Sequence, residues 1–297
     1  MNISAQPQHL VDSAFARDYS LLKPSLVPQW LATLALAAAL VAAVYSSWVI
    51  QSLPDFAAWT APTLLLVALL SAVLITPRVF TVGYLISLLT FLIAWRVGVM
   101  NDARVLVWIA SIASMVLLAQ FIDCVISDWR RNRGAAGAWF GTMMWQATIV
   151  RMYFGLNEVG HSTEKIFAGM GSFHHLVSIF QSLGLGAIAP IFVVLAGLTE
   201  LFSAVSVGLG LFARLGGFVS LGYFLVATVG FGGEWARGYA WATPGGGGWE
   251  YVMMLLVVFG SVMLSGAGKF SLDGWLLQRN LLPKWLQVAA TNSEGRQ

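Results

Sequence analysis

Charged residues are scarce in this 297-residue sequence. Asp, Glu, Lys and Arg together make up 10% of it, against about a quarter in soluble globular proteins. Hydrophobic residues make up 58% and fill long segments that are apolar on every helical face. Such helices are either buried in a large core or face lipid. The composition therefore excludes an ordinary soluble domain and predicts an all-α, polytopic transmembrane helical bundle. The net charge of +3 is too small to indicate nucleic-acid binding.

Cysteine is nearly absent as well. The single residue, Cys124, excludes an intramolecular disulfide, a CxxC redox pair and a four-cysteine iron–sulfur cluster. His161, His174 and His175 lie in one segment, but their spacing matches no HExxH or comparable zinc signature. No histidine lies inside a predicted span, which disfavours transmembrane haem. We therefore expect no metal, haem or iron–sulfur site in the chain.

Eight segments are long and apolar enough to cross about 30 Å of hydrocarbon. Prolines stand in the gaps around them, where the chain turns. The first 27 residues hold no compact apolar stretch with a cleavage site, so the first span is expected to direct insertion. The predicted spans are residues 29–51, 57–76, 79–97, 104–127, 138–158, 187–211, 214–232 and 249–266.

The basic residues predict the orientation of the bundle. An even number of spans leaves both termini on one side, and that side holds eleven Lys and Arg residues, against four on the other. Because cytoplasmic loops are enriched in Lys and Arg, we expect both termini in the cytoplasm and the chain in the cell inner membrane. The first group is Arg17, Lys23, Arg78, Arg130, Arg131, Arg133, Arg214, Lys269, Arg279, Lys284 and Arg296, and the second is Arg96, Arg104, Lys165 and Arg237.

Two segments resemble helices that lie on the membrane surface. In SFHHLVSIFQSLG, residues 172–184, apolar side chains repeat at helical spacing, with Ser172 placed to cap the start and Gly184 the end. This segment is too short to span, so we expect an amphipathic helix at the periplasmic face. The stretch LDGWLLQRNLLPKWLQ mixes Trp and Leu with charged residues and predicts two cytoplasmic interfacial helices separated by Pro283.

These features divide the chain into four parts. Residues 1–28 are a cytoplasmic N-terminal segment, 29–133 an unassigned four-helix membrane region, 134–276 a second four-helix membrane domain, and 277–297 an interfacial helix and tail. The basic run WRRNRGAAG marks the boundary between the two membrane regions. The stretch GAGKFSLDGW, near the end of the second region, predicts a turn at the cytoplasmic surface, in which Ser271 or Asp273 caps the following helix.

Two ionisable residues stand deep inside predicted spans of the second half. Arg151 interrupts the apolar run WQATIVRMYFGLNEVG, and Glu200 lies near the middle of the next span. A charge at such depth costs at least about 2.5 kcal/mol, so each side chain should face protein and find a partner. We expect the two to pair and to form a catalytic or quinone-protonating site. The alternative is that the pair only fastens two helices together.

The end of the Arg151 helix adds further polar residues. Asn157, Glu158, His161 and Lys165 follow it at the expected periplasmic boundary, and His174 lies in the short helix beyond. These residue types can donate and accept hydrogen bonds and protons. We expect these five residues to contribute to substrate binding.

The pattern of these pieces resembles the DoxX family, and more closely the DoxD-like small subunit of thiosulfate:quinone oxidoreductase. The resemblance covers about residues 139–276. It rests on Arg151 with Gly155, on residues 160–165, on LAGLTELFSAVSVGLGLFARLGG, and on WEYVMMLLVVFGSVMLSGAGKFSLDGW. By the family pattern the recurrent polar positions are Arg151, Lys165, Glu200 and Arg214, which adds Arg214 to the substrate-binding candidates.

The resemblance implies a four-helix bundle and a function in quinone-linked oxidation of thiosulfate or another reduced sulfur compound. The expected partners are the lipid bilayer, a quinone, and a second redox subunit or larger membrane complex that supplies electrons. Residues 1–138 match no motif of the family. The alternative function is therefore a non-catalytic membrane scaffold or accessory subunit of a larger complex.

Overall fold

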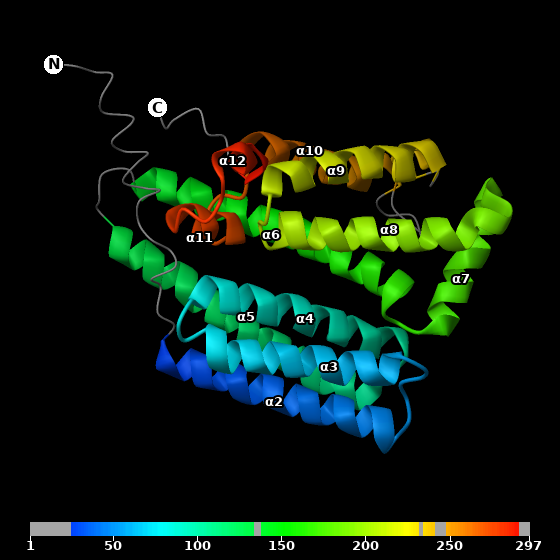
Figure 1. Ribbon diagram of the computed structural model, residues 1–297, viewed down its shortest axis with the longest axis horizontal. Coiled ribbons are helices and arrows are strands. Elements are labelled where there is room, and N and C mark those ends of the chain that lie inside the picture. The colour runs from blue at the N-terminus through cyan, green and yellow to red at the C-terminus, as the bar shows by residue number, and fades with distance from the viewer. Residues whose placement is uncertain (1–24, 134–137, 232–233, 241–247, 291–297) are drawn as a thin grey trace.

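The computed structural model describes residues 25–133, 138–231, 234–240 and 248–290. Within these ranges every regular element is a helix and no strand occurs, which confirms the predicted all-α fold. The long helices run side by side along one axis (Figure 1). Since the described chain begins with α2 and ends with α12 at the same end of this axis, we call that end proximal. The opposite end, which carries α7, is the distal end.

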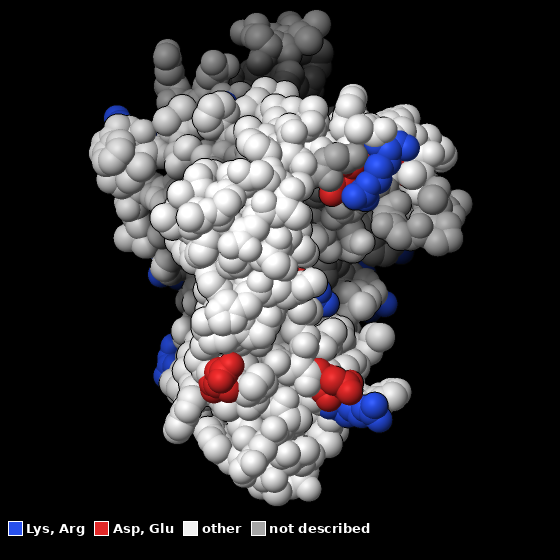
Figure 2. Space-filling view, turned by 90° about the vertical axis from the view of Figure 1, so that its right-hand side faces the viewer, with Lys and Arg blue, Asp and Glu red and all other residues white. Residues whose placement is uncertain are grey.

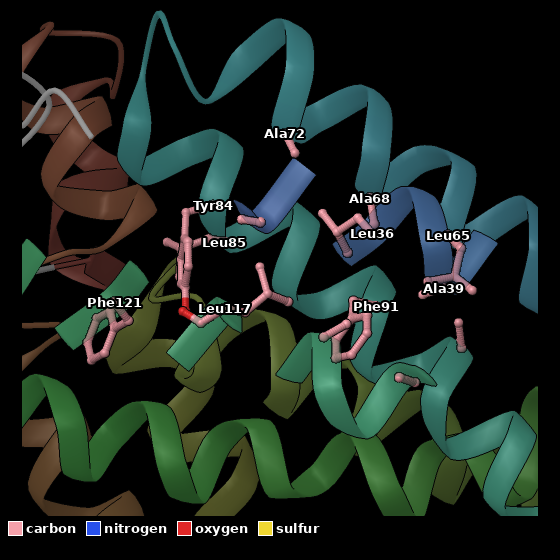
Figure 3. Close-up of a cluster of buried hydrophobic side chains, with 14 of the residues drawn as sticks. Leu36, Ala39, Leu65, Ala68, Ala72, Tyr84, Leu85, Phe91, Leu117 and Phe121 are labelled. Atoms are coloured by element: carbon pink, nitrogen blue, oxygen red, sulfur yellow. The ribbon is translucent and has the colours of Figure 1, made fainter. Parts of the chain in front are cut away.

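The first half of the chain forms a four-helix unit. Its helices are α2 (Leu26–Trp48), α3 (Ala57–Leu70), which continues as a π-helical turn to Ile75, α4 (Phe80–Met100) and α5 (Arg104–Asn132). Alanines line the buried faces, which lets the helix backbones approach closely. Larger side chains, among them Leu36, Leu65, Phe91 and Leu117, fill the space between them (Figure 3).

The second half packs beside the first. It consists of α6 (Ala138–Ile166), α8 (Ala189–Ser203) with its π-helical extension η5 (Ala204–Gly208), α9 (Ala213–Phe224) with the extension η6 (Leu225–Phe231), and α10 (Trp249–Ser265). Helix α6 contacts α8, η5 and α10, and α10 lies along α9. Residues 134–137, at the predicted boundary between the halves, lie outside the described chain. The division into two membrane domains stays a prediction.

Three short helices lie at the two ends of the bundle. Helix α7 (Met170–Phe180) stands across the distal end between α6 and α8, which confirms a short helix at this point (Figure 1). Its place on the membrane surface stays a prediction. Its predicted cap was wrong, because Gly169 precedes its first turn and the Ser172 hydroxyl donates to the Glu164 carbonyl instead. The predicted stop is present, because Gly184 adopts a φ of 93°. Helices α11 (Leu272–Gln278) and α12 (Lys284–Ala290) lie at the proximal end, as the predicted interfacial pair.

The protein is a multi-pass membrane protein. Six helical stretches of the described chain are long and apolar enough to cross a bilayer. Helices α6 and α10 complete the eight expected spans in the arrangement of Figure 1, although α10 is only 17 residues long. The number of crossings therefore stays a prediction. Figure 2 looks onto the distal end, where most of the visible surface carries no charged side chain.

The two halves share one core. The largest buried cluster joins α2–α5 to Trp145 and Met152 of α6 and to Phe270. A second contact joins Ile93 of α4, Val159 of α6 and Ala204. Helix α6 therefore lies between the halves, and the polar groups on it can meet both.

Candidate functional site

Arg151 is buried at the point where η5 ends. Its guanidinium donates to the backbone carbonyls of Val207 and Gly208, the latter at 2.7 Å, and to that of Phe270 at 3.1 Å. The last carbonyls of a helix have no partner within the helix, and they carry the negative end of its dipole. A cation at this point satisfies both requirements. Arg151 therefore closes the end of α8 and η5 and ties it to the segment before α11.

The predicted pair of Arg151 with Glu200 was wrong. The two side chains form no ion pair in the structure, because Arg151 bonds three carbonyls and Glu200 has other partners. Glu200 stands eight residues before Gly208 along α8 and η5, which places it roughly 10 Å further toward the distal end. Sequence spacing suggested equal depth because it could not show that α6 extends well beyond α8 at the proximal end (Figure 1).

The segment 266–273 was predicted at the cytoplasmic surface but is buried. Its Lys269 ammonium forms an ion pair at 2.9 Å with Asp128 of α5, whose carboxylate also accepts a hydrogen bond from the Trp145 indole. The Lys269 carbonyl accepts a hydrogen bond from Thr148. The segment turns inward because these groups and the Arg151 guanidinium bind its backbone and side chains. It joins both halves of the molecule at the proximal end.

Asp273 holds the start of α9. Its carboxylate accepts hydrogen bonds from the backbone N–H groups of Phe212, at 2.7 Å, and Ala213, at 2.9 Å. Burial raises the pKa of the Asp273 carboxyl to about 6, although these two donors and the Arg151 charge act to lower it. The carboxyl is thus mainly ionised at neutral pH. Ser271 caps α11, as one of the two predicted alternatives, by accepting a hydrogen bond from Gly274 N–H.

A second polar group lies further toward the distal end, and we call it the inner polar cluster. It consists of Glu158 and Lys165 of α6, Glu200 of α8 and Tyr223 of α9. Lys165 Nζ lies 2.9 Å from Glu200 Oε2, and the Tyr223 hydroxyl donates to Glu200 Oε1 at 2.8 Å. The Lys165 and Glu200 side chains are only 8% and 6% exposed. One carboxylate thus holds three helices together inside an apolar bundle.

Glu158 is the unusual member of this cluster. It is fully buried, and neither carboxylate oxygen has a hydrogen-bond partner among the described residues. It interacts electrostatically with Glu200 and Lys165. Burial of a carboxylate without partners is costly, so an unpartnered buried acid is an indicator of function. The inner polar cluster therefore combines a paired carboxylate, an unpaired one, an ammonium and a phenol.

The first half of the chain reaches this cluster through Arg96. The guanidinium of Arg96 in α4 pairs with the carboxylate of Glu164, which precedes Lys165 in α6. These two side chains are 34% and 22% exposed, more than those of the adjoining Lys165–Glu200 pair. The ion pair therefore lies beside the cluster in a more exposed position.

The other predicted site residues are not members of the inner polar cluster. Asn157 donates to the Tyr251 hydroxyl of α10 at 2.9 Å. His161 is exposed but lies beside the cluster, because its carbonyl accepts a hydrogen bond from Lys165 and its imidazole interacts electrostatically with Glu200 and Lys165. His174 is exposed on α7. Arg214 binds the carbonyls of Met263 and Val288 at the proximal end, away from the cluster.

Sequence reasoning named Glu158 and Lys165 as substrate-binding candidates and Glu200 as a catalytic one, and the structure brings these three together; it did not name Tyr223 or Arg96. Tyr223 is a hydroxyl-bearing residue within a predicted span, and that was the available signal. The sequence signal for Arg96 is weaker, because Arg96 stands at the end of a predicted span, where basic residues are common. In the part of the chain that the structure describes, no group of three or more His, Cys, Asp or Glu side chains could hold a metal ion.

Comparison with known proteins bears on part of the chain. A family model described as DoxX matches residues 146–233. No curated protein matches the sequence, and no solved structure matches it either. The matched residues run from α6 through α9 and η6, and they include Arg151 and all four members of the inner polar cluster. The chain is therefore similar to the DoxX family over residues 146–233.

Proposed function

We propose that the chain is an integral membrane subunit of a quinone-linked oxidoreductase and that the inner polar cluster exchanges protons with the quinone. Reduction of a quinone to a quinol takes up two electrons and two protons. The protons must be delivered where the quinone head group is held, and apolar side chains cannot deliver them. Positioned carboxyl, ammonium and phenol groups can.

One observation carries this proposal: the unpartnered Glu158 beside the Lys165–Glu200–Tyr223 contacts. Ionisable residues within membrane helices are costly and commonly mark substrate or proton pathways. A purely structural role would be served by the single ion pair. A structural role gives no reason for the second buried carboxyl, Glu158, which forms no hydrogen bond with the described residues.

The electrons would come from outside this chain. Its single cysteine, Cys124, is buried and cannot supply a dithiol or an iron–sulfur cluster. We propose that the quinone receives its electrons from a second redox subunit. The other source is direct transfer from thiosulfate or another reduced sulfur compound. The resemblance of the sequence to DoxD-like subunits supports this class of donor.

The alternative function is a non-catalytic scaffold in a larger membrane complex. One feature favours it: α7 has no buried residue and stands across the distal end, where a partner could cover it. A scaffold role would use that surface and would leave the inner polar cluster without a function beyond fastening helices.

Experiments on one protein preparation can distinguish the two proposed functions. The chain would be produced in bacterial membranes that contain quinone, extracted into lipid nanodiscs, and analysed for bound quinone by solvent extraction and chromatography. An azidoquinone photoprobe followed by peptide mapping would locate the contact. We expect stoichiometric quinone and labelling of α6, α8 or α9. Absence of quinone and of specific labelling would contradict the proposed function and favour the scaffold.

A further inference from the structure

The charges around the inner polar cluster do not balance. Two cations, Arg96 and Lys165, face three carboxyl groups, Glu158, Glu164 and Glu200. Each cation forms an ion pair with one carboxylate, Arg96 with Glu164 and Lys165 with Glu200. Glu158 is left over, and it is 0% exposed.

The groups that face Glu158 come from several helices. Lys165 is on α6, Glu200 on α8, Tyr223 on α9 and Tyr251 on α10, and all four interact with it electrostatically. None of them donates a hydrogen bond to it in the structure. An ionised carboxylate in such surroundings would be strongly destabilised, whereas a neutral carboxylic acid would not. The geometry therefore favours a Glu158 that carries a proton.

The exposure of the side chains decreases in one direction. The Arg96–Glu164 pair is partly exposed, the Lys165–Glu200 pair is nearly buried, and Glu158 is completely buried. On α6, Glu158, His161 and Lys165 are separated by three and four residues and so share one face. This face leads from the distal end of α6 inward. Toward the proximal end the next buried ionisable residue on α6 is Arg151, which is held by backbone carbonyls.

We propose that Glu158 is a proton-binding site that exchanges with water at the distal end through Glu164 and Glu200. Glu158 gives its proton to the Glu200 carboxylate, from which the proton passes to the Glu164 carboxylate and then to a water molecule at the distal surface, which becomes hydronium. The reverse transfer from hydronium protonates Glu158 again. One O–H bond breaks as another forms at each step, so no oxidant or reductant is needed. The inference deepens the proposed function, on which its physiological role rests, by assigning the side from which protons enter.

Infrared difference spectroscopy on the full chain in nanodiscs tests the site without any quinone. Wild-type protein should show the C=O stretch of a protonated buried carboxylic acid, and the band should shift in D2O. Glu158→Gln should lose that band, and Asp102→Asn, an exposed acid-to-amide change at the distal end, should retain it. If Glu158→Gln does not fold, Glu158→Asp should keep a carboxyl band at a shifted frequency. A band that neither Glu158 variant alters would overturn the proposal.

The rate at which the band shifts after transfer to D2O tests the direction of entry. Glu164→Gln or Glu200→Gln should slow it by about tenfold or more. Asp123→Asn, the same chemical change on α5 toward the proximal end, should leave the rate unchanged. Slowing by Asp123→Asn alone would place the entrance at the proximal end and contradict the proposal. A protein that shows the band but holds no bound quinone would contradict the proposed quinone function and would still support the proton-binding site.

Discussion

The two buried cations of α6 are stabilised in different ways. Arg151 donates its planar fork to three backbone carbonyls, whereas Lys165 places a point charge against one carboxylate. A guanidinium suits several fixed acceptors at once, and an ammonium suits a single carboxylate. Arg151 thus belongs to the framework of the domain, and Lys165 belongs to the inner polar cluster.

Double-mutant cycles should separate these two roles. Lys165→Met with Glu200→Gln should show a coupling of about 0.5–3 kcal/mol in the free energy of unfolding, because each single change leaves a buried group without its partner. Arg151→Met with Glu200→Gln should be additive within about 0.5 kcal/mol, because they share no partner. Thermal unfolding in detergent measures both. Strong coupling in the second cycle would instead indicate that Arg151 and Glu200 interact directly.

At the scale of elements, helix α6 approaches η5 more closely than side chains would allow. A Cβ added at Gly155 would lie 2.2 Å from the backbone nitrogen of Gly208, so no side chain fits there. This approach places the η5 carbonyls within reach of Arg151, one turn earlier on α6. The glycine therefore determines the geometry of the Arg151 contacts.

Gly155→Ala should destabilise the protein, since the two helix backbones must separate, by roughly 1–3 kcal/mol as for other overpacked sites. The matched control is Gly222→Ala in α9, where an added Cβ meets nothing within 4 Å. That change should be neutral or slightly stabilising, because alanine favours helix over glycine. The melting temperatures of the two variants, measured in the same detergent, compare their stabilities. Equal effects would contradict the close approach as the cause.

At the scale of the whole molecule, two ion pairs join the halves at opposite ends. Arg96–Glu164 does so toward the distal end and Lys269–Asp128 at the proximal end. The unassigned first half thus supplies a group next to the inner polar cluster, as well as packing for α6. Removal of the first half would expose both the core around Phe270 and the Glu164 carboxylate.

The orientation of the molecule can be tested on the full chain. Ser182→Cys, just beyond α7, should react with a membrane-impermeant maleimide added outside intact cells, and Arg133→Cys should react only after lysis. Both positions are exposed, and the native Cys124 is buried, so background labelling should be low. The reason for the expected sides is the excess of Lys and Arg at the proximal end. Labelling of Arg133→Cys in intact cells would reverse the orientation.

Sequence reasoning gave the helices and the buried charges but not their partners. Hydrophobic length and proline positions predicted α2–α10 and the short helices, because a membrane leaves few other choices for an apolar chain. Burial of Arg151 and Glu200 followed from the cost of charge. The partners of Arg151 are backbone carbonyls, which have no residue signature. The inward turn of Lys269 depends on Asp128, 141 residues away.

We propose that the inner polar cluster, and not Arg151, performs the chemistry. The most direct measurement is the rate of thiosulfate- or sulfide-dependent quinol formation in membranes that contain the chain. Folded Glu158→Gln and Glu200→Gln variants should lose about a hundredfold or more, the lower range for loss of a general acid or base. Asp102→Asn should keep the wild-type rate. A folded Glu158→Gln protein that reduces quinone at the wild-type rate would contradict a role of the inner polar cluster in the chemistry.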